Sequence, residues 1–246
     1  EEINNLDFSN HEVVEYIAQA MMNVIDDSYI SYIKWDMNRC MSEASYKATH
    51  DVSSQGRVMH EYILGVYHLY DILTTKYPDI SLNPVQVEEL RFDPGMLYYA
   101  LNVGPVMIPM TIERIKDSIG TSLVYPLSSM GSHVSAIPNH QTFRNTPLES
   151  ANVAYFGTFG YELDVNQLTF EEKELIKKQI SFMKQYRSLF LFGTFYRLKS
   201  PFTSNETAWM VVSHDKTQAI VGYYRPLQEV NVGYRRFTLL GLDEDK

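Results

Sequence analysis

The sequence is poor in the features that mark several large classes of protein. It holds a single cysteine, Cys40, so no internal disulfide can form, and we expect a reducing, cytoplasmic compartment. Cys40 itself is more typical of a small buried residue than of a nucleophile. The formal net charge is −9 and Lys and Arg form no block, which argues against nucleic acid and anionic membranes as partners. No apolar run approaches the roughly 20 residues of a membrane span.

Motifs for several kinds of chemistry are also missing. There is no glycine-rich phosphate loop, and no serine stands in a nucleophile-elbow context. The histidines His133 and His140 lack the converging neighbours that a metal site needs. We therefore expect neither a cofactor nor a metal. No signal peptide is visible, and because the chain opens on Glu1 without an initiator Met, we expect a piece of a longer protein.

What the chain does have is a regular alternation of helical and strand-like segments. Helices are expected after a capping box formed by Ser9 and Glu12, and in residues 55–76, 112–119 and 169–189. Strands are expected in residues 29–37, near residues 80 and 100, and in residues 122–127 and 152–156. This alternation favours βα units and a parallel sheet.

The pattern changes after residue 189. Four short β runs follow, in residues 190–198, 208–213, 219–225 and 235–240, with turn residues between them. Such a series is typical of an all-β domain. We therefore divide the chain into an α/β part, residues 1–189, and the beginning of a β domain, residues 190–246.

One segment carries most of the functional information. The apolar residues Tyr32 and Ile33 lead into Lys-Trp-Asp-Met-Asn-Arg at positions 34–39, so a carboxylate stands at the end of a predicted strand. Active sites of (β/α)8 barrels lie at the C-terminal ends of strands, and a glycosidase needs a carboxylate there. The alternative is a buried Asp36 in a structural ion pair with Lys34 or Arg39. The segment alone favours neither reading.

This segment resembles the nucleophile motif of glycoside hydrolase family 36, the retaining α-galactosidases. Further motifs of that family follow in its order over nearly the whole chain, beginning at Leu6, Arg91, Gly120, Ser132, Pro138 and Phe156. The resemblance implies part of a (β/α)8 TIM barrel, about strands four to eight, followed by an incomplete C-terminal β-sandwich domain. It also implies hydrolysis of terminal α-galactosyl residues of melibiose- and raffinose-type sugars, and an intact parent that forms a homo-oligomer.

The resemblance assigns roles to individual residues. Asp36 would be the nucleophile, and Lys34, Trp35, Asn38 and Arg91 would bind the sugar. Other matching residues are equally consistent with structural roles: Arg39 with an ion pair, Asp93 with a helix cap, and His133, Asn139 and His140, expected on a loop, with hydrogen bonds inside the protein.

Two segments depart from the family pattern. A retaining glycosidase needs a second carboxyl about 5 Å from the first, and the family supplies it from a Trp-Thr-Ser-Asp-Asn/Asp-Thr-Asp motif. Residues 104–110 instead read Gly-Pro-Val-Met-Ile-Pro-Met, so Met107 occupies the acid/base position. A thioether cannot transfer a proton. Residues 82–90 likewise replace the family's Phe-Glu-Ser-Cys-Ser-Gly-Gly-Gly-Gly loop, and we expect this chain to be inactive.

Both departures have one explanation in the genetic code. Residues 104–110 can be encoded by GGA CCA GTG ATG ATA CCG ATG, which after a preceding T reads Trp-Thr-Ser-Asp-Asp-Thr-Asp in the shifted frame. The same one-base shift turns residues 82–89 into Phe-Glu-Ser-Cys-Ser-Gly-Gly-Gly. We hypothesise two short frame slips in the DNA sequence. The competing hypothesis is true divergence to a catalytically dead carbohydrate-binding homologue, and a family transglycosylase or α-N-acetylgalactosaminidase is a further alternative.

Overall fold

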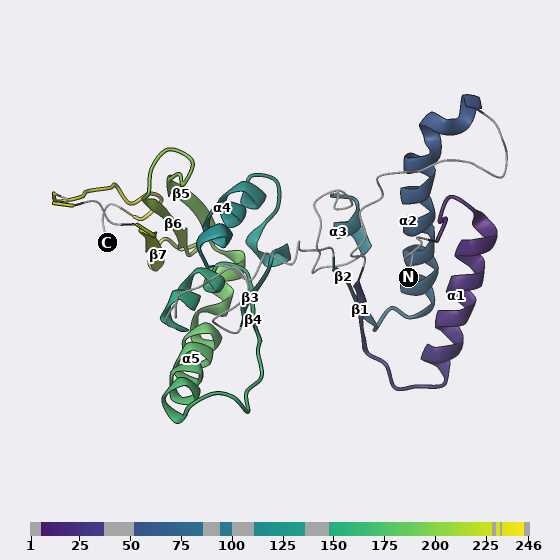
Figure 1. The fold of residues 1–246 in the computed structure, drawn as a ribbon, viewed down its shortest axis with the longest axis horizontal. Helices are drawn as coiled ribbons and strands as arrows, with labels where there is room; N and C mark the ends of the chain where they lie inside the picture. The colour runs from purple at the N-terminus through teal and green to yellow at the C-terminus, as the bar shows by residue number, and fades with distance from the viewer. Residues whose placement is uncertain are drawn as a thin grey trace. The chain divides into compact units, whose positions relative to one another are not determined.

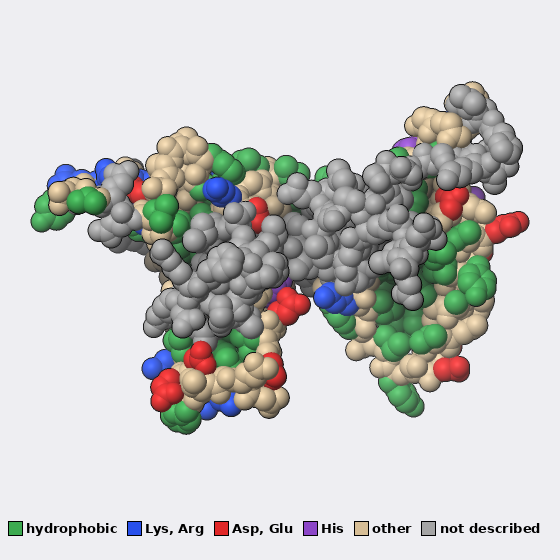
Figure 2. Space-filling model, viewed as in Figure 1, with side chains coloured by type: hydrophobic (Ala, Val, Ile, Leu, Met, Phe, Trp, Pro, Cys, Tyr) green, Lys and Arg blue, Asp and Glu red, His purple; other side chains and the backbone are tan. Residues whose placement is uncertain are grey.

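The protein folds into two compact units, Glu1–Pro105 and Val106–Lys246. The computed structural model describes residues 6–36, 52–85, 94–99, 111–135, 148–227, 230–231 and 233–243 (Figure 1). Each unit contains a pair of parallel strands with helices packed beside it, which confirms the predicted α/β class. Figure 2 shows acidic side chains spread over both units with basic side chains among them.

The first unit consists of two long helices and two parallel strands. Helices α1 (His11–Asp26) and α2 (Val58–Lys76) lie side by side (Figure 1), and a 3-10 turn, η1 (Val52–Arg57), leads into α2. Strand β1 (Tyr32–Asp36) pairs in parallel with β2 (Ser81–Val85), so that α2 connects two neighbouring parallel strands. The short helix α3 (Met96–Tyr99) completes the unit. This is the βα arrangement that the sequence predicts.

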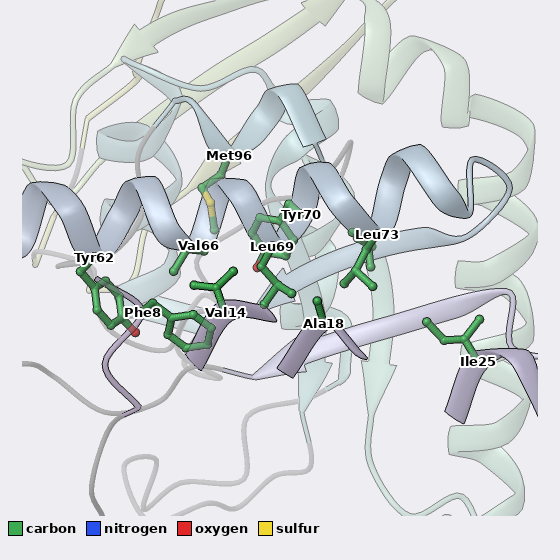
Figure 3. Close-up of a cluster of buried hydrophobic side chains, with 11 residues drawn as sticks. Phe8, Val14, Ala18, Ile25, Tyr62, Val66, Leu69, Tyr70, Leu73 and Met96 are labelled. Atoms are coloured by element: carbon green, nitrogen blue, oxygen red, sulfur yellow. The ribbon is translucent and has the colours of Figure 1, made fainter. Parts of the chain in front are cut away.

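The core of the first unit lies between its helices and one face of its strands. Figure 3 shows Val14 and Ala18 of α1 facing Leu69 and Leu73 of α2, and all four side chains are fully or almost fully buried. Buried Leu82 of β2 belongs to the same cluster, and half-buried residues of β1 pack against it. The core therefore fixes which face of β1 and β2 points toward the helices.

The second unit begins with a similar strand pair. Helix α4 (Thr111–Ser122) and the 3-10 turn η2 (Leu127–Ser129) precede β3 (Gly131–Ser135). A longer 3-10 segment, η3 (Leu148–Tyr155), then leads to β4 (Thr158–Glu162), which pairs in parallel with β3. Helix α5 (Phe170–Phe192) follows and begins with a complete capping box, in which the Thr169 hydroxyl accepts from the Glu172 amide and the Glu172 carboxylate accepts from the Thr169 amide.

A three-stranded antiparallel sheet closes the described part of the chain. Its strands are β5 (Thr194–Lys199), β6 (Thr207–Val212) and β7 (Ala219–Tyr224), in the order β5-β6-β7. Trp209 and Val211 of β6 are buried in the same cluster as Phe156 of the connection before β4 and Phe190 of α5. The sheet and the helices of this unit therefore share one hydrophobic core.

The segment of residues 233–243 contacts all three strands without forming a strand itself. The Phe237 ring stacks on Tyr223 of β7, with centroids 5.6 Å apart. The Leu240 amide donates to the sulfur of Met210 in β6 at 3.4 Å, and Gly241 lies against the Tyr196 ring of β5. The strand predicted in residues 235–240 is therefore wrong, because this segment bonds to side chains rather than to a neighbouring strand.

Three other expectations need correction. The N-cap of α1 is Asn10, whose side chain accepts from the Glu12 amide, while Ser9 hydrogen-bonds to Asp7. Residues 122–127 form the end of α4 and a turn, and residues 152–156 lie largely in η3 rather than in strands. Short apolar runs do not separate a buried strand from a buried helical turn, which explains the last two errors. The strand expected near residue 100 lies outside the described residues.

Candidate functional site

Lys34 lies on the face of β1 that points away from the helices. Side chains alternate along a strand, so Tyr32 and Lys34 share this face. The Asn83 side-chain amide donates to the Tyr32 hydroxyl across the strand pair at 2.6 Å, and Lys34 lies opposite Asn83 in the parallel register. Lys34 is exposed to solvent. The cation is therefore available to a ligand above this face.

Asp36 is the last residue of β1, as the sequence predicts. The carboxyl ends of parallel strands are the edge at which open and closed α/β sheets bind their ligands. A position that ends such a strand, two residues after the exposed Lys34, is suited to a carboxylate that acts on a bound substrate.

Trp35 lies on the opposite face of β1 from Lys34. Its ring centroid is 6.3 Å from that of Phe8 and 5.7 Å from that of Tyr70, and it packs against the core of the first unit. The indole therefore contacts the helices that support β1. These contacts make Trp35 a residue that positions the strand. Its contact with the sugar stays a prediction.

The other residues singled out from the sequence lie outside the described residues. They are Asn38, Arg39, Cys40, Arg91, Asp93, Met107, Asn139 and His140.

Among the residues that the structure does describe, no group of His, Cys, Asp and Glu could hold a metal ion. No helix in the described ranges is long and apolar enough to cross a membrane.

A second group of polar residues lies on the strand pair of the second unit. His133 is inside β3, not on a loop, and its Nε2 is 2.8 Å from Oε2 of Glu162, the last residue of β4. The buried guanidinium of Arg114 in α4 donates to the His133 carbonyl oxygen. Burial lowers the pKa of Arg114 to about 10, against the opposing effect of the charges of Asp117 and Glu162.

Glu162 is the polar residue that sequence reasoning missed at this position. It stands in a matched segment, Phe-Gly-Tyr-Glu-Leu-Asp at positions 159–164, and like Asp36 it is a carboxylate that ends a strand. The same pattern that drew attention to Asp36 could have identified it.

Comparison with known proteins decides the family. The melibiase family model matches residues 2–193, and the model of the glycosyl hydrolase family 36 C-terminal domain matches residues 206–246. The chain belongs to the melibiases of glycoside hydrolase family 36. It is 45% identical over 98% of its length to the α-galactosidase AgaA of Geobacillus stearothermophilus. It is 40% identical, again over 98% of its length, to the α-galactosidase Mel36A of Lactobacillus acidophilus.

Solved structures of melibiases share the fold of this chain. A variant of AgaA in complex with raffinose superposes with a TM-score of 0.90 at 45% identity, over 98% of this chain. Another AgaA variant, in complex with stachyose, also gives a TM-score of 0.90. The chain covers 33% of each of these structures and 33% of the curated AgaA and Mel36A sequences. It therefore corresponds to about a third of such a melibiase.

Proposed function

We propose that this chain is part of a retaining exo-α-galactosidase that acts on melibiose- and raffinose-type sugars. The observation that carries the proposal is the position of Asp36 at the carboxyl end of β1, two residues after the exposed Lys34, in a chain of the melibiase family. The relatives that bind raffinose and stachyose support the choice of substrate class. The two parallel strand pairs would belong to one (β/α)8 barrel, and β5-β6-β7 would begin a β-sandwich domain from about residue 190.

In this proposal the reaction is a double displacement. The Asp36 carboxylate attacks the anomeric carbon of the terminal galactose, and the bond from that carbon to the leaving oxygen breaks. A carboxylic acid at position 107 donates its proton to the leaving oxygen and then, as a carboxylate, removes a proton from the water that hydrolyses the galactosyl-enzyme. Lys34 would bind a galactose hydroxyl. No cofactor takes part in these steps.

With Met107 at the acid/base position this scheme has no proton donor for the leaving oxygen and no base for the attacking water. We propose that the gene encodes aspartate there and that two short frame slips, each of one base and each repaired within about ten codons, altered residues 82–90 and 104–110. Resequencing the DNA from codon 77 to codon 116 tests this hypothesis. Insertions or deletions flanking the two segments would restore both motifs, whereas an unchanged sequence would overturn the frame-slip hypothesis.

The activity itself is tested on the intact gene product with its verified reading frame. We expect release of galactose from melibiose and raffinose, with net retention at the anomeric carbon. Asp36→Asn should abolish turnover while raffinose still binds, because the amide cannot form the galactosyl-enzyme. Asp79→Asn, at an exposed aspartate before β2, is the matched control and should leave turnover unchanged. Equal activity of the parent and Asp36→Asn would contradict the assignment.

A second candidate function is sugar binding without hydrolysis, and the methionine at position 107 is the observation that favours it. If resequencing confirms Met107, calorimetric titration with raffinose should show binding without galactose release. An N-acetylated substrate and product analysis with excess acceptor sugar would distinguish the α-N-acetylgalactosaminidase and transglycosylase alternatives.

A further inference from the structure

Helix α1 has more apolar surface than the core of the first unit covers. Its buried residues Val14, Ala18 and Ile25 recur at helical spacing and form one face, which packs in that core. A second face of the helix is polar and exposed to solvent, and it carries Glu12, Glu15, Gln19, Asn23 and Asp26. The core face and the polar face leave room for a third face between them.

The third face of α1 is an apolar stripe formed by Val13, Tyr16, Ala20 and Val24, which follow one another at intervals of three or four residues. The Tyr16 side chain is 73% exposed and that of Val24 is 58% exposed. Ala20 is exposed as well, and Val13 is half-buried. In Figure 2 hydrophobic side chains reach the surface over α1. A helix that is apolar beyond its core face is typical of one that packs against a further neighbour.

The order of elements in the first unit indicates what this neighbour is. Helix α1 leads into β1, and α2 leads into β2, which pairs in parallel with β1. The two helices lie side by side (Figure 1), as consecutive crossovers of one hand do. Among the described residues β1 pairs with β2 alone, so its other edge is open to the strand of a preceding unit. The helix of that unit would lie beside α1, as α1 lies beside α2.

Such a helix has no room in this chain ahead of α1. Five residues precede Leu6, the first described residue, and a typical helix needs about 11. The chain covers 33% of AgaA, and the C-terminal domain model of the family matches its last residues, 206–246. Most of the remainder of such a relative therefore comes before the matched part, where a further helix can be encoded.

We propose that the apolar stripe of α1 is the docking surface for a helix of the intact gene product that lies upstream of Glu1. The inference rests on the barrel architecture in the proposed function and not on its chemistry. A stripe of four residues suits one helix of the same chain, whose docking needs no further contact area. A stable interface with a second copy needs about 20–30 residues on each partner, far more than the stripe supplies.

The test places the photoreactive amino acid p-benzoylphenylalanine at position 16 or position 24 of the intact gene product with its verified reading frame. On irradiation the benzophenone group bonds covalently to the side chain or backbone that it touches, and mass spectrometry of the digested protein identifies the partner peptide. We expect both positions to cross-link to one segment upstream of Glu1. The matched control is position 19, since Gln19 lies on the polar face of the same helix, and it should not cross-link to that segment.

Three results would overturn the proposal: a cross-link within residues 1–246, a cross-linked dimer of two subunits, or no cross-link at either position. If the substituted proteins do not fold, hydroxyl-radical footprinting of the unmodified protein takes their place. Tyr16 should then be oxidised several-fold more slowly in the native protein than in urea, and equal rates would overturn the proposal.

Galactose release from raffinose, measured on the same preparations, separates this inference from the proposed function. An inactive protein with the upstream cross-link would overturn the proposed function and leave the docking surface in place. An active protein without that cross-link would overturn the inference alone.

Discussion

Gly65 of α2 lies directly against the backbone of Phe8, in the segment that leads into α1. A β-carbon on Gly65 would overlap the Phe8 carbonyl oxygen and lie 2.8 Å from its carbonyl carbon. The obstacle is main chain, which cannot rotate away as a side chain could. The absence of a side chain at position 65 therefore sets how closely the two segments approach.

We expect Gly65→Ala to lower the free energy of unfolding by about 2 kcal/mol, because overpacking against backbone outweighs the better helix propensity of alanine. Urea denaturation followed by circular dichroism measures the change. Gly120→Ala is the control: Gly120 lies in α4, and a β-carbon built there would meet no atom of the described residues within 4 Å. That substitution should stabilise by roughly 0.5–1 kcal/mol, and equal effects of the two would contradict the steric argument.

The contacts of Trp35 predict a stability phenotype. Trp35→Ala should destabilise by about 3 kcal/mol, since truncating a large aromatic residue leaves a cavity beside Phe8 and Tyr70. Trp35→Phe should restore most of that loss. Tyr29→Ala, at a fully exposed aromatic residue, should change little. The positioning role of Trp35 would be wrong if Trp35→Phe kept its stability but lost raffinose affinity to the same extent as Trp35→Ala.

The ion pairs of Glu206 should contribute to the free energy of unfolding in a way that depends on pH. It lies before β6, with Oε2 2.5 Å from Lys199 Nζ and Oε1 3.0 Å from Arg235 Nε. The hydrogen bond from Lys199, followed by smaller effects of Tyr223 and Arg235, holds the pKa of Glu206 below its ordinary value of 4.5. A carboxyl with a lowered folded-state pKa stabilises the protein above its ordinary pKa.

The parent should therefore be more stable than Glu206→Gln above pH 4.5, and the difference should shrink as pH falls through the lowered pKa of Glu206. Melting temperatures measured between neutral and acid pH, at several salt concentrations, would show this trend. Asp79→Asn should not reproduce it. A difference between the parent and Glu206→Gln that stays constant down to strongly acid pH would contradict the ionic origin.

Substitution of Lys34 should weaken the binding of raffinose by the intact gene product. Lys34→Met should raise the KM for raffinose by roughly 10- to 100-fold, because a hydrogen bond from a charged donor is lost. Lys76→Met is the control. Lys76 lies at the C-terminal end of α2, and its Nζ is 2.8 Å from Oδ2 of Asp26 at the C-terminal end of α1. A drop in melting temperature with unchanged KM would mean that Lys34 serves the fold instead.

The sequence predicts the fold best where a periodic apolar stripe and a terminal cap agree. Thr169 is followed by Glu172 and a helical stripe, and α5 begins there as expected. Residues 153–156 are all buried, so their run of apolar residues carries no period that separates strand from helical turn. At the other end of α5, the sequence predicts a β run from residue 190, but the helix continues to Phe192. Phe190 is buried in the core there, which favours the longer helix.

For the candidate site, the sequence predicts where a residue stands along its strand, but it does not predict which side chains surround it. It places Asp36 at a strand end, and strand alternation alone already separates Trp35 from Lys34. Which face meets the helices depends on Phe8 and Tyr70, which contact Trp35 from distant parts of the chain. The pairing of His133 with Glu162 likewise depends on the register of two strands, and periodicity carries no information about register.

The core shared by Phe156, Phe190, Trp209 and Val211 also limits how this part of the family can evolve. A recombination break near residue 190 would separate aromatic rings that pack against each other, such as Phe156 and Trp209, 5.6 Å apart. Any replacement sheet would have to supply complementary side chains at the positions of Trp209 and Val211. The segment before α5 and the sheet after it should therefore be inherited together, and substitutions on one side should be accompanied by compensating substitutions on the other.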